Sequence, residues 1–307
     1  MLEPEIAQYV AFCEQYEVPL GFETVALQRE RYNEMRAKLA EPLPEAVVTE
    51  DALVKAEAGH QIPIRIYRTT TEANQPCCLF MHGGGFVVGN IQTHHDWIGE
   101  LADLSGVSIV SVDYRLSPEV TYPAALHDVR DVLLDMVKRA SEYQIDTERI
   151  AVSGDSAGGN LAAAICLLSR DKEMPPLSSQ LLIYPGLGAS HASASYEAHA
   201  NAPLLKTSEL SFYLEAYLGH TEPDKYALPL LEQDFSRLPP AFILTVEHDP
   251  IRDDGILYAK RLRGAGVAVE HYDAPGLVHG CMQARRTSPE TRKAFDAWAN
   301  ALKDFSR

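Results

Sequence analysis

A serine in a glycine-flanked turn is the residue of this sequence best placed to do chemistry. The segment GDSAGG at residues 154–159 follows the apolar run RIAVS and precedes the helical pattern NLAAAICLLSR. A sharp strand-to-helix turn presents a serine hydroxyl above the edge of a sheet, and Gly154 and Gly158 leave room for it. The N–H of Ala157, at the helix start, would face negative charge developing on a substrate. We therefore predict that Ser156 is a nucleophile; the alternative is a tight turn with an idle serine.

A second glycine-rich turn, HGGGF at residues 82–86, directly follows the apolar run CCLFM. Consecutive glycines let backbone N–H groups approach a ligand closely, because no side chain stands in the way. We expect the N–H groups of Gly84 and Gly85 to form an oxyanion hole together with that of Ala157. The alternative is a flexible glycine turn.

The same glycines also allow an interpretation of a different class. Gly83, Gly85 and Gly89 follow a strand pattern and Asp113 ends the next one, which superficially resembles a dinucleotide-binding fingerprint. The last glycine falls one residue late for G-x-G-x-x-G. This interpretation also leaves Ser156 without a purpose, so we favour the nucleophile.

A nucleophilic serine needs a base, and the base needs an acid that orients it. Among the histidines after residue 226, only His279 lies in a loop just past the last strand pattern. His271 lies within that strand, and His248 lies in the turn expected to supply the acid. We interpret both as packed or solvated histidines and predict that His279 is the base.

The acid is expected in the turn after the run AFILTVEH. Asp249 follows that run directly, and Pro250 stiffens the turn. Glu247 is the main alternative, whereas Asp253 and Asp254 fit the first turn of the next helix, where the helix dipole favours acids. We predict Asp249, which completes the chain order serine, acid, histidine.

Short apolar runs alternate with helical patterns from residue 76 onward. This alternation predicts an α/β fold with a mostly parallel central sheet and helices on both faces. The runs are CCLFM, VSIVSVD, RIAVSG, QLLIYP, AFILTVE and VAVEHYD, and the helices are expected at about residues 95–105, 122–140, 157–170, 252–264 and 287–304. Two alternating segments before them, AVVTEDALVKAEAG and QIPIRIYR, predict an antiparallel hairpin at the sheet edge.

Two stretches fall outside this alternation and are predicted to form a helical cap. Residues 1–45 carry two amphipathic helical patterns followed by a proline-containing break. Residues from 187 to about 226 separate two strands by far more than the usual connection, and they contain the helical pattern SELSFYLEAYLG. We therefore expect a catalytic domain at 46–307, with the second cap piece inserted at about 187–226.

Taken together, the motifs resemble those of the hormone-sensitive lipase family of α/β-hydrolases, in particular its bacterial carboxylesterases and acetyl esterases. The resemblance covers roughly two thirds of the chain and rests on HGGGF, DYRLSPE with YPAAL, GDSAGGN, DPIRDDG and the loop from Gly276 to His279. It implies the α/β-hydrolase fold with a helical cap.

The resemblance also implies roles for particular residues. Its catalytic positions are Ser156, Asp249 and His279, its oxyanion-hole positions are Gly84, Gly85 and Ala157, and its supporting motif positions are His82, Gly83, Gly154, Asp155 and Gly158. One departure is that Gly280 and Cys281 follow His279, where the family commonly has an aromatic residue. This affects the expected acyl pocket more than the catalytic residues.

We expect hydrolysis of short-chain carboxylic esters, acetyl to about hexanoyl, through an acyl-enzyme intermediate and without a cofactor or metal. An amidase or peptidase using the same residues is the nearest alternative, because the sequence does not encode the leaving group. A non-catalytic, ligand-binding member of the family is the other alternative.

The composition bears on partners and location. A formal charge of −16 disfavours nucleic acid and anionic membranes, which leaves a small-molecule ester as the expected partner, and a homodimer stays open. The N-terminus carries acids where a signal peptide needs a basic start, and no apolar run is long enough to span a membrane. Five cysteines without CxxC spacing are typical of reduced thiols, so we expect a cytoplasmic protein.

Overall fold

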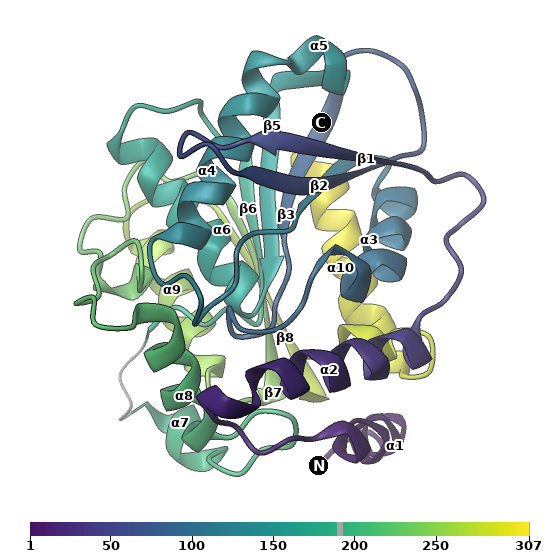
Figure 1. The fold of residues 1–307 in the computed structure, drawn as a ribbon, viewed down its shortest axis with the longest axis vertical. Coiled ribbons are helices and arrows are strands. Elements are labelled where there is room, and N and C mark those ends of the chain that lie inside the picture. Colours follow the sequence, from purple (N-terminus) through teal and green to yellow (C-terminus); the bar gives the residue numbers. More distant parts are fainter. Residues whose placement is uncertain (189–192, 307) are drawn as a thin grey trace.

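The chain folds around one eight-stranded, mostly parallel sheet (Figure 1), which confirms the predicted fold class. A computed structural model describes residues 1–188 and 193–306. The strands run in the order β1-β2-β4-β3-β5-β6-β7-β8, and only the β1–β2 and β2–β4 pairs are antiparallel. Their bounds are β1 Val48–Lys55, β2 Gln61–Arg68, β3 Gln75–Met81, β4 Ser108–Val112, β5 Ile145–Asp155, β6 Ser179–Ile183, β7 Ala241–His248 and β8 Val269–Val278.

Helices cover both faces of this sheet (Figure 1). Helices α4, α6 and α9 pack on one face, and α3 and α10 pack on the other. The α-helices are α1 Pro4–Cys13, α2 Val25–Leu39, α3 Ile91–Ser105, α4 Ala124–Lys138, α5 Ala140–Tyr143, α6 Ala157–Asp171, α7 Ala194–Ala198, α8 Thr207–Leu218, α9 Arg252–Gly264 and α10 Pro289–Phe305. Short 3-10 turns lie at Glu14–Tyr16, Phe22–Thr24, Pro229–Leu231 and Cys281–Ala284.

Alternation along each central strand supplies two hydrophobic cores. In β3, Leu79 and Met81 face the α4 and α6 side, whereas Cys78 and Phe80 face the α3 and α10 side. A strand buried on both faces reads as a continuous apolar run, which is why CCLFM and its counterparts were recognisable in the sequence. All five cysteines are free and buried.

Two helix boundaries differ from the predicted ones. Helix α3 begins at Ile91 because the Asn90 side chain accepts a hydrogen bond from Thr93 N–H and the Thr93 side chain accepts one from Asn90 N–H. This capping box lies upstream of the apolar periodicity, so the periodicity alone placed the start too late. The helix expected at 122–140 is α4 followed by the single turn α5.

The N-terminal helices and the inserted segment lie at one end of the sheet. Figure 1 shows α1, α2, α7 and α8 together at the bottom of the molecule, toward which the parallel strands run. Residues 189–192 of the insertion lie outside the described residues. Within the described ranges, no helix is long and apolar enough to cross a membrane.

A buried ion cluster fixes the chain that follows the last strand. The Arg285 side chain is fully buried and donates to Asp96 at 2.9 Å and to Glu100 at 2.7 Å, both on α3. Since Arg285 lies six residues after His279, the cluster holds the His279 loop against the helix layer.

Arg285→Met should lower the free energy of unfolding by about 3–5 kcal/mol, because it removes the one cation among the described residues in contact with the buried Asp96, while Glu100 keeps Arg292. Urea denaturation would measure this loss. Lys293→Met is a control outside the cluster, since Lys293 is 62% exposed and pairs with Glu290; it should cost far less. Equal losses in the two variants would show that the buried cluster contributes nothing special.

Candidate active site

The serine turn adopts the strained geometry that its sequence predicts. Ser156, between β5 and α6, has φ +54° and ψ −116°. A Cβ on Gly158 would lie 1.9 Å from the Met81 carbonyl oxygen, and one on Gly154 would lie 2.3 Å from the Gly158 backbone. The Ser156 N–H donates to the Ile183 carbonyl at 2.9 Å. Only glycines at these two positions let the turn approach β3 so closely.

Three side chains from distant parts of the chain meet at this turn. The Ser156 Oγ lies 2.8 Å from His279 Nε2, and His279 Nδ1 lies 2.8 Å from Asp249 Oδ2. Asp249 is fully buried just after β7, and its other carboxylate oxygen accepts the Ile251 N–H at 2.9 Å. Because a carboxylate can only accept, His279 donates from Nδ1, and its Nε2 is left to accept the Ser156 proton.

The three residues predicted to form the oxyanion hole line the same cavity as the serine. Gly84 and Gly85, at φ +121° and +61°, and Ala157 all line the cavity that contains Ser156. Within residues 1–188 and 193–306, these amides donate to no acceptor of the protein. A Cβ on Gly85 would lie 2.2 Å from the Tyr213 ring, so this position also requires glycine.

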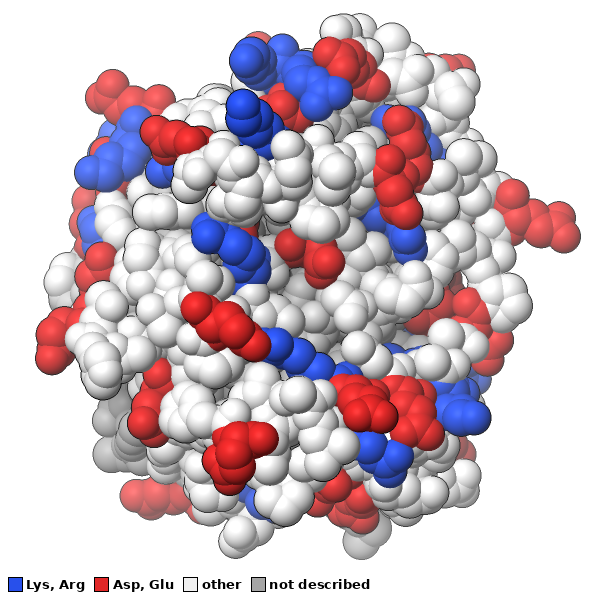
Figure 2. Space-filling view, viewed as in Figure 1, with Lys and Arg blue, Asp and Glu red and all other residues white. Residues whose placement is uncertain are grey.

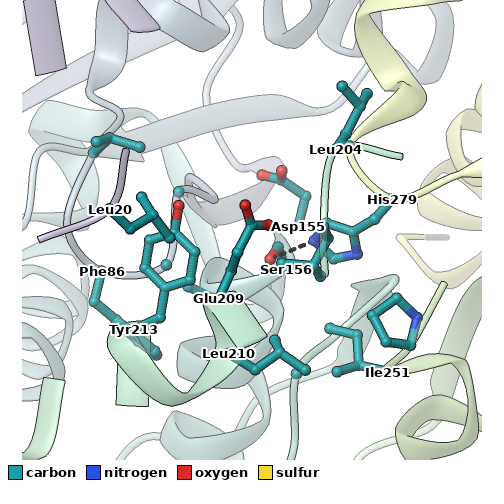
Figure 3. Close-up of a pocket in the computed structure, with 18 of the residues that line it drawn as sticks. Leu20, Phe86, Asp155, Ser156, Leu204, Glu209, Leu210, Tyr213, Ile251 and His279 are labelled. Atoms are coloured by element: carbon teal, nitrogen blue, oxygen red, sulfur yellow. Dashed lines mark hydrogen bonds between the residues drawn. The ribbon is translucent and has the colours of Figure 1, made fainter. Parts of the chain in front are cut away.

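The cavity above Ser156 has a volume of about 370 Å³. Figure 3 shows the serine and His279 at its base, with apolar side chains around them from the N-terminal segment, the glycine loop and the insertion. These are Leu20, Phe86, Leu204, Leu210, Tyr213 and Ile251. Such a concave, mostly apolar site with a few convergent polar groups is typical of small-molecule binding.

Comparison with known proteins agrees with this geometry. A family model described as the α/β hydrolase fold matches residues 78–283, more than half of the chain. The chain belongs to the α/β-hydrolases.

Relatives of this α/β-hydrolase resemble it over nearly the whole chain. The carboxylesterase NlhH of Mycobacterium tuberculosis is 38% identical over 285 residues, covering 91% of this chain and 89% of that protein. The ethyl acetate hydrolase of Pseudomonas putida is 32% identical, covering 92% of each chain. Among solved structures, the hyperthermophilic esterase of the archaeon Pyrobaculum calidifontis matches with a TM-score of 0.90 and 32% identity, covering 99% and 98% of the two chains.

The carboxylates weighed as alternatives to Asp249 anchor loops of the hydrolase instead. Glu247 accepts the Gly276 N–H at 2.7 Å, which fixes the loop before His279. Asp254 accepts the N–H groups of Leu187 and Gly188, and Asp253 accepts that of Ser195. These hydrogen bonds could not be predicted from the sequence. Their donors are backbone N–H groups, which almost any residue type can supply.

The alternative histidines have other neighbours. His271 Nε2 lies 2.9 Å from the Thr245 hydroxyl, and the His248 ring packs edge-on against His199.

Among the described residues, no group of three or more His, Cys, Asp and Glu side chains could hold a metal ion.

The glycine loop of the hydrolase folds on itself rather than opening like a phosphate-binding turn. A Cβ on Gly89 would lie 2.4 Å from the Gly83 carbonyl oxygen. His82 donates from Nδ1 to that same oxygen at 2.9 Å and stacks on Tyr114, with ring centroids 4.3 Å apart. Burial lowers the pKa of His82 to about 3, so the ring is neutral and serves as a brace. The dinucleotide interpretation is therefore not favoured.

Asp155 links the two glycine-rich turns. It is buried, and its Oδ1 accepts the Gly83 N–H at 2.8 Å and lies 3.4 Å from His94 Nε2. Burial opposes ionisation, but the interaction with His94, the charge of Arg36 and the Gly83 N–H outweigh it and hold the pKa of Asp155 below its usual range. The residue before the nucleophile thus positions the loop that carries Gly84 and Gly85.

Asp155→Asn should lower the free energy of unfolding by about 1–3 kcal/mol at pH 7, because an uncharged amide replaces a buried, hydrogen-bonded carboxylate. A depressed pKa in the folded state means that the carboxylate stabilises the fold above its unfolded pKa and loses this effect as pH falls through the folded value. The difference between wild type and variant should therefore shrink below about pH 4. Urea denaturation at a series of pH values measures it, and a constant difference from pH 7 to pH 3 would contradict the role.

Proposed function

We propose that this α/β-hydrolase is a serine carboxylesterase in which Ser156 is the nucleophile, His279 the base and Asp249 the orienting acid. The pair of 2.8 Å contacts that joins these three side chains supports the proposal more than any other observation. The relatives in the comparison are named as ester hydrolases, which supports carboxylic esters as the substrate class.

In the first half-reaction, Ser156 Oγ attacks the ester carbonyl carbon while its proton passes to His279 Nε2. The carbonyl oxygen becomes an oxyanion, and the N–H groups of Gly84, Gly85 and Ala157 hold it by hydrogen bonds. Collapse of this intermediate breaks the bond to the alcohol oxygen, which leaves with the proton from His279. Asp249 stabilises the transient imidazolium without taking its proton.

In the second half-reaction, a water molecule gives a proton to His279 and attacks the acyl carbon. The same three amides hold the second oxyanion. Its collapse releases the carboxylic acid and returns the proton to Ser156 Oγ, which restores the starting state. No redox step and no further reactant are needed.

The cavity volume and the name of one relative both support short acyl chains. A volume of about 370 Å³ lies at the lower end of the range for small-molecule sites, and it is divided between the acyl and alcohol parts of the ester. Ethyl acetate hydrolysis by a relative that covers 92% of this chain also supports a short acyl group. No relative reported above is named for amide hydrolysis, so the amidase alternative is not favoured.

The face seen in Figure 2 supports a soluble substrate rather than an interface. Acidic and basic side chains are interspersed over this face, with no large basic area to attract anionic headgroups or a nucleic acid backbone. We propose that a small-molecule ester is the partner of the site.

Ser156→Ala should lower kcat for p-nitrophenyl acetate by about 10⁴-fold or more. His279→Asn should lower it equally, because the serine attacks only when the histidine takes its proton, so loss of either side chain stops the same step. His248→Asn is the matched control and should keep wild-type turnover. Stopped-flow release of p-nitrophenol by the wild type should show a burst of about one equivalent per active site when deacylation is rate-limiting. Near-normal turnover by Ser156→Ala, with the fold verified by circular dichroism, would refute the nucleophile.

The acyl preference is tested with p-nitrophenyl esters from acetate to palmitate. We expect kcat/KM to peak between acetyl and hexanoyl and to fall for dodecanoyl and longer chains, because the cavity cannot hold them together with the alcohol. The measurements should be made below the concentration at which each ester aggregates. A maximum at palmitate would contradict the short-chain proposal while leaving the catalytic residues intact.

A further inference from the structure

A buried arginine on α2 has no carboxylate in direct contact. Arg36 is 7% exposed, and no carboxylate lies within 4 Å of its guanidinium in the described part of the chain. Its Nη2 donates to the Tyr32 hydroxyl at 2.8 Å, and its guanidinium carbon lies 4.9 Å from the centre of that ring. Its Nε has no hydrogen-bond partner in the described protein. Arg36 therefore keeps donors that nothing in the fold uses.

Other buried arginine side chains among the described residues have carboxylates in contact. Arg285 has Asp96 and Glu100 within 3 Å, and Arg170, whose side chain is 6% exposed, has Asp171 and Glu232 within 3 Å. Taking a charge out of water costs several kcal/mol unless a counter-charge compensates, so a buried arginine without a carboxylate in contact is costly to keep. Asp155 offsets part of this cost at longer range, since Arg36 helps to hold the pKa of Asp155 below its usual range. A ligand that carries an anionic group would offset the rest.

Arg36 lies in the wall of the cavity that contains Ser156 and His279, and it is the only Lys or Arg among the described lining residues. Tyr9, which also lines the cavity, donates from its hydroxyl to the Gly280 carbonyl at 3.0 Å, next to His279. The charge of Arg36 reaches Tyr9, although burial keeps that phenol neutral by raising its pKa. The guanidinium thus belongs to the part of the cavity where α1 and α2 approach the histidine loop.

The same helix face carries further polar groups toward the cavity. Gln28, Tyr32 and Arg36 follow each other at intervals of four residues, so they lie on one face of α2, and all three line the cavity. The Gln28 Oε1 is buried without a hydrogen-bond partner in the described protein. The Gln28 Nε2 donates to Gly21 and Thr24, so only the oxygen of this amide is unused. The free Gln28 oxygen and the free Arg36 Nε–H on one wall indicate that this side of the cavity recognises a polar group.

We propose that Arg36 binds a carboxylate carried by the ester, so that the preferred substrates are half-esters of dicarboxylic acids or esters with a carboxylate in the alcohol part. This inference rests on the proposed ester hydrolysis. A planar guanidinium with a free Nε–H matches a carboxylate through two parallel hydrogen bonds, which an ammonium cannot reproduce. Four acids also line the cavity, Glu17, Asp155, Glu209 and Asp254, so an anionic group needs a cation beside it, and Arg36 is the one Lys or Arg among the described lining residues.

The test compares monomethyl adipate with methyl hexanoate, which have the same scissile bond and differ by a terminal carboxylate. We expect Arg36→Met to lower the ratio of their kcat/KM values by about tenfold or more, mainly through KM for the adipate. Arg36→Lys should give an intermediate ratio. Lys38→Met removes an exposed cation from the same helix and should leave the ratio unchanged.

A ratio that Arg36→Met does not change, in a variant with the wild-type circular dichroism spectrum, would overturn the proposal. The wild type provides a measurement that does not depend on any variant folding: rejection of monomethyl adipate by more than about 100-fold relative to methyl hexanoate would also overturn it.

Binding separates this proposal from the proposed function. Calorimetry of Ser156→Ala with monomethyl adipate should show binding that is lost in Ser156→Ala with Arg36→Met. If the wild type hydrolyses neither ester, ester hydrolysis fails, yet this pair of titrations still supports the carboxylate site. Absence of binding to Ser156→Ala would overturn the carboxylate site while leaving hydrolysis of methyl hexanoate to be judged on its own.

Discussion

The serine turn can exist only because no side chain stands between it and the strand beside it. The α-carbon of Gly158 approaches the Met81 carbonyl so closely that even a methyl group would collide with it. This contact fixes the end of β5 against the end of β3, and the glycine loop continues directly from Met81. Ser156 and the glycine loop are therefore held side by side by one backbone contact, and the parallel sheet carries Asp249 and His279 to the same edge.

Carboxylates organise the rest of the site, and each accepts backbone N–H groups. Asp155 holds the glycine loop, Glu247 holds the loop before His279, and Asp254 holds the start of the insertion. These hydrogen bonds favour the charged form of the acids, because they replace hydration. Part of the excess of acids over bases in the sequence thus serves to hold loops in place. Arg36, in the cavity wall, is not satisfied by the fold in this way.

The sequence predicted the sheet, its flanking helices and the residues that meet at the site, because these leave local signals. A strand buried on both faces reads as an apolar run, and a strained turn needs glycines at fixed positions. Arg36 left no such signal, since in an amphipathic helical pattern it counts as an ordinary polar residue. The tethers of Asp253, Asp254 and Glu247 were equally hidden, because a backbone N–H can be supplied by any residue except proline. The start of α3 was placed late because the capping box at Asn90 precedes the periodic part of the helix.

The hydrogen bond from Tyr9 to Gly280 spans 271 positions of the chain. The helices that enclose the substrate are thus made first, but the carbonyl on which they close is made near the end. At a synthesis rate of about 5–20 residues per second, the two sides are separated by roughly 15 to 55 s on the ribosome. Helix α2 packs against α3, which follows it closely in the chain, whereas α1 reaches its final place on the histidine loop only when nearly the whole chain has been made.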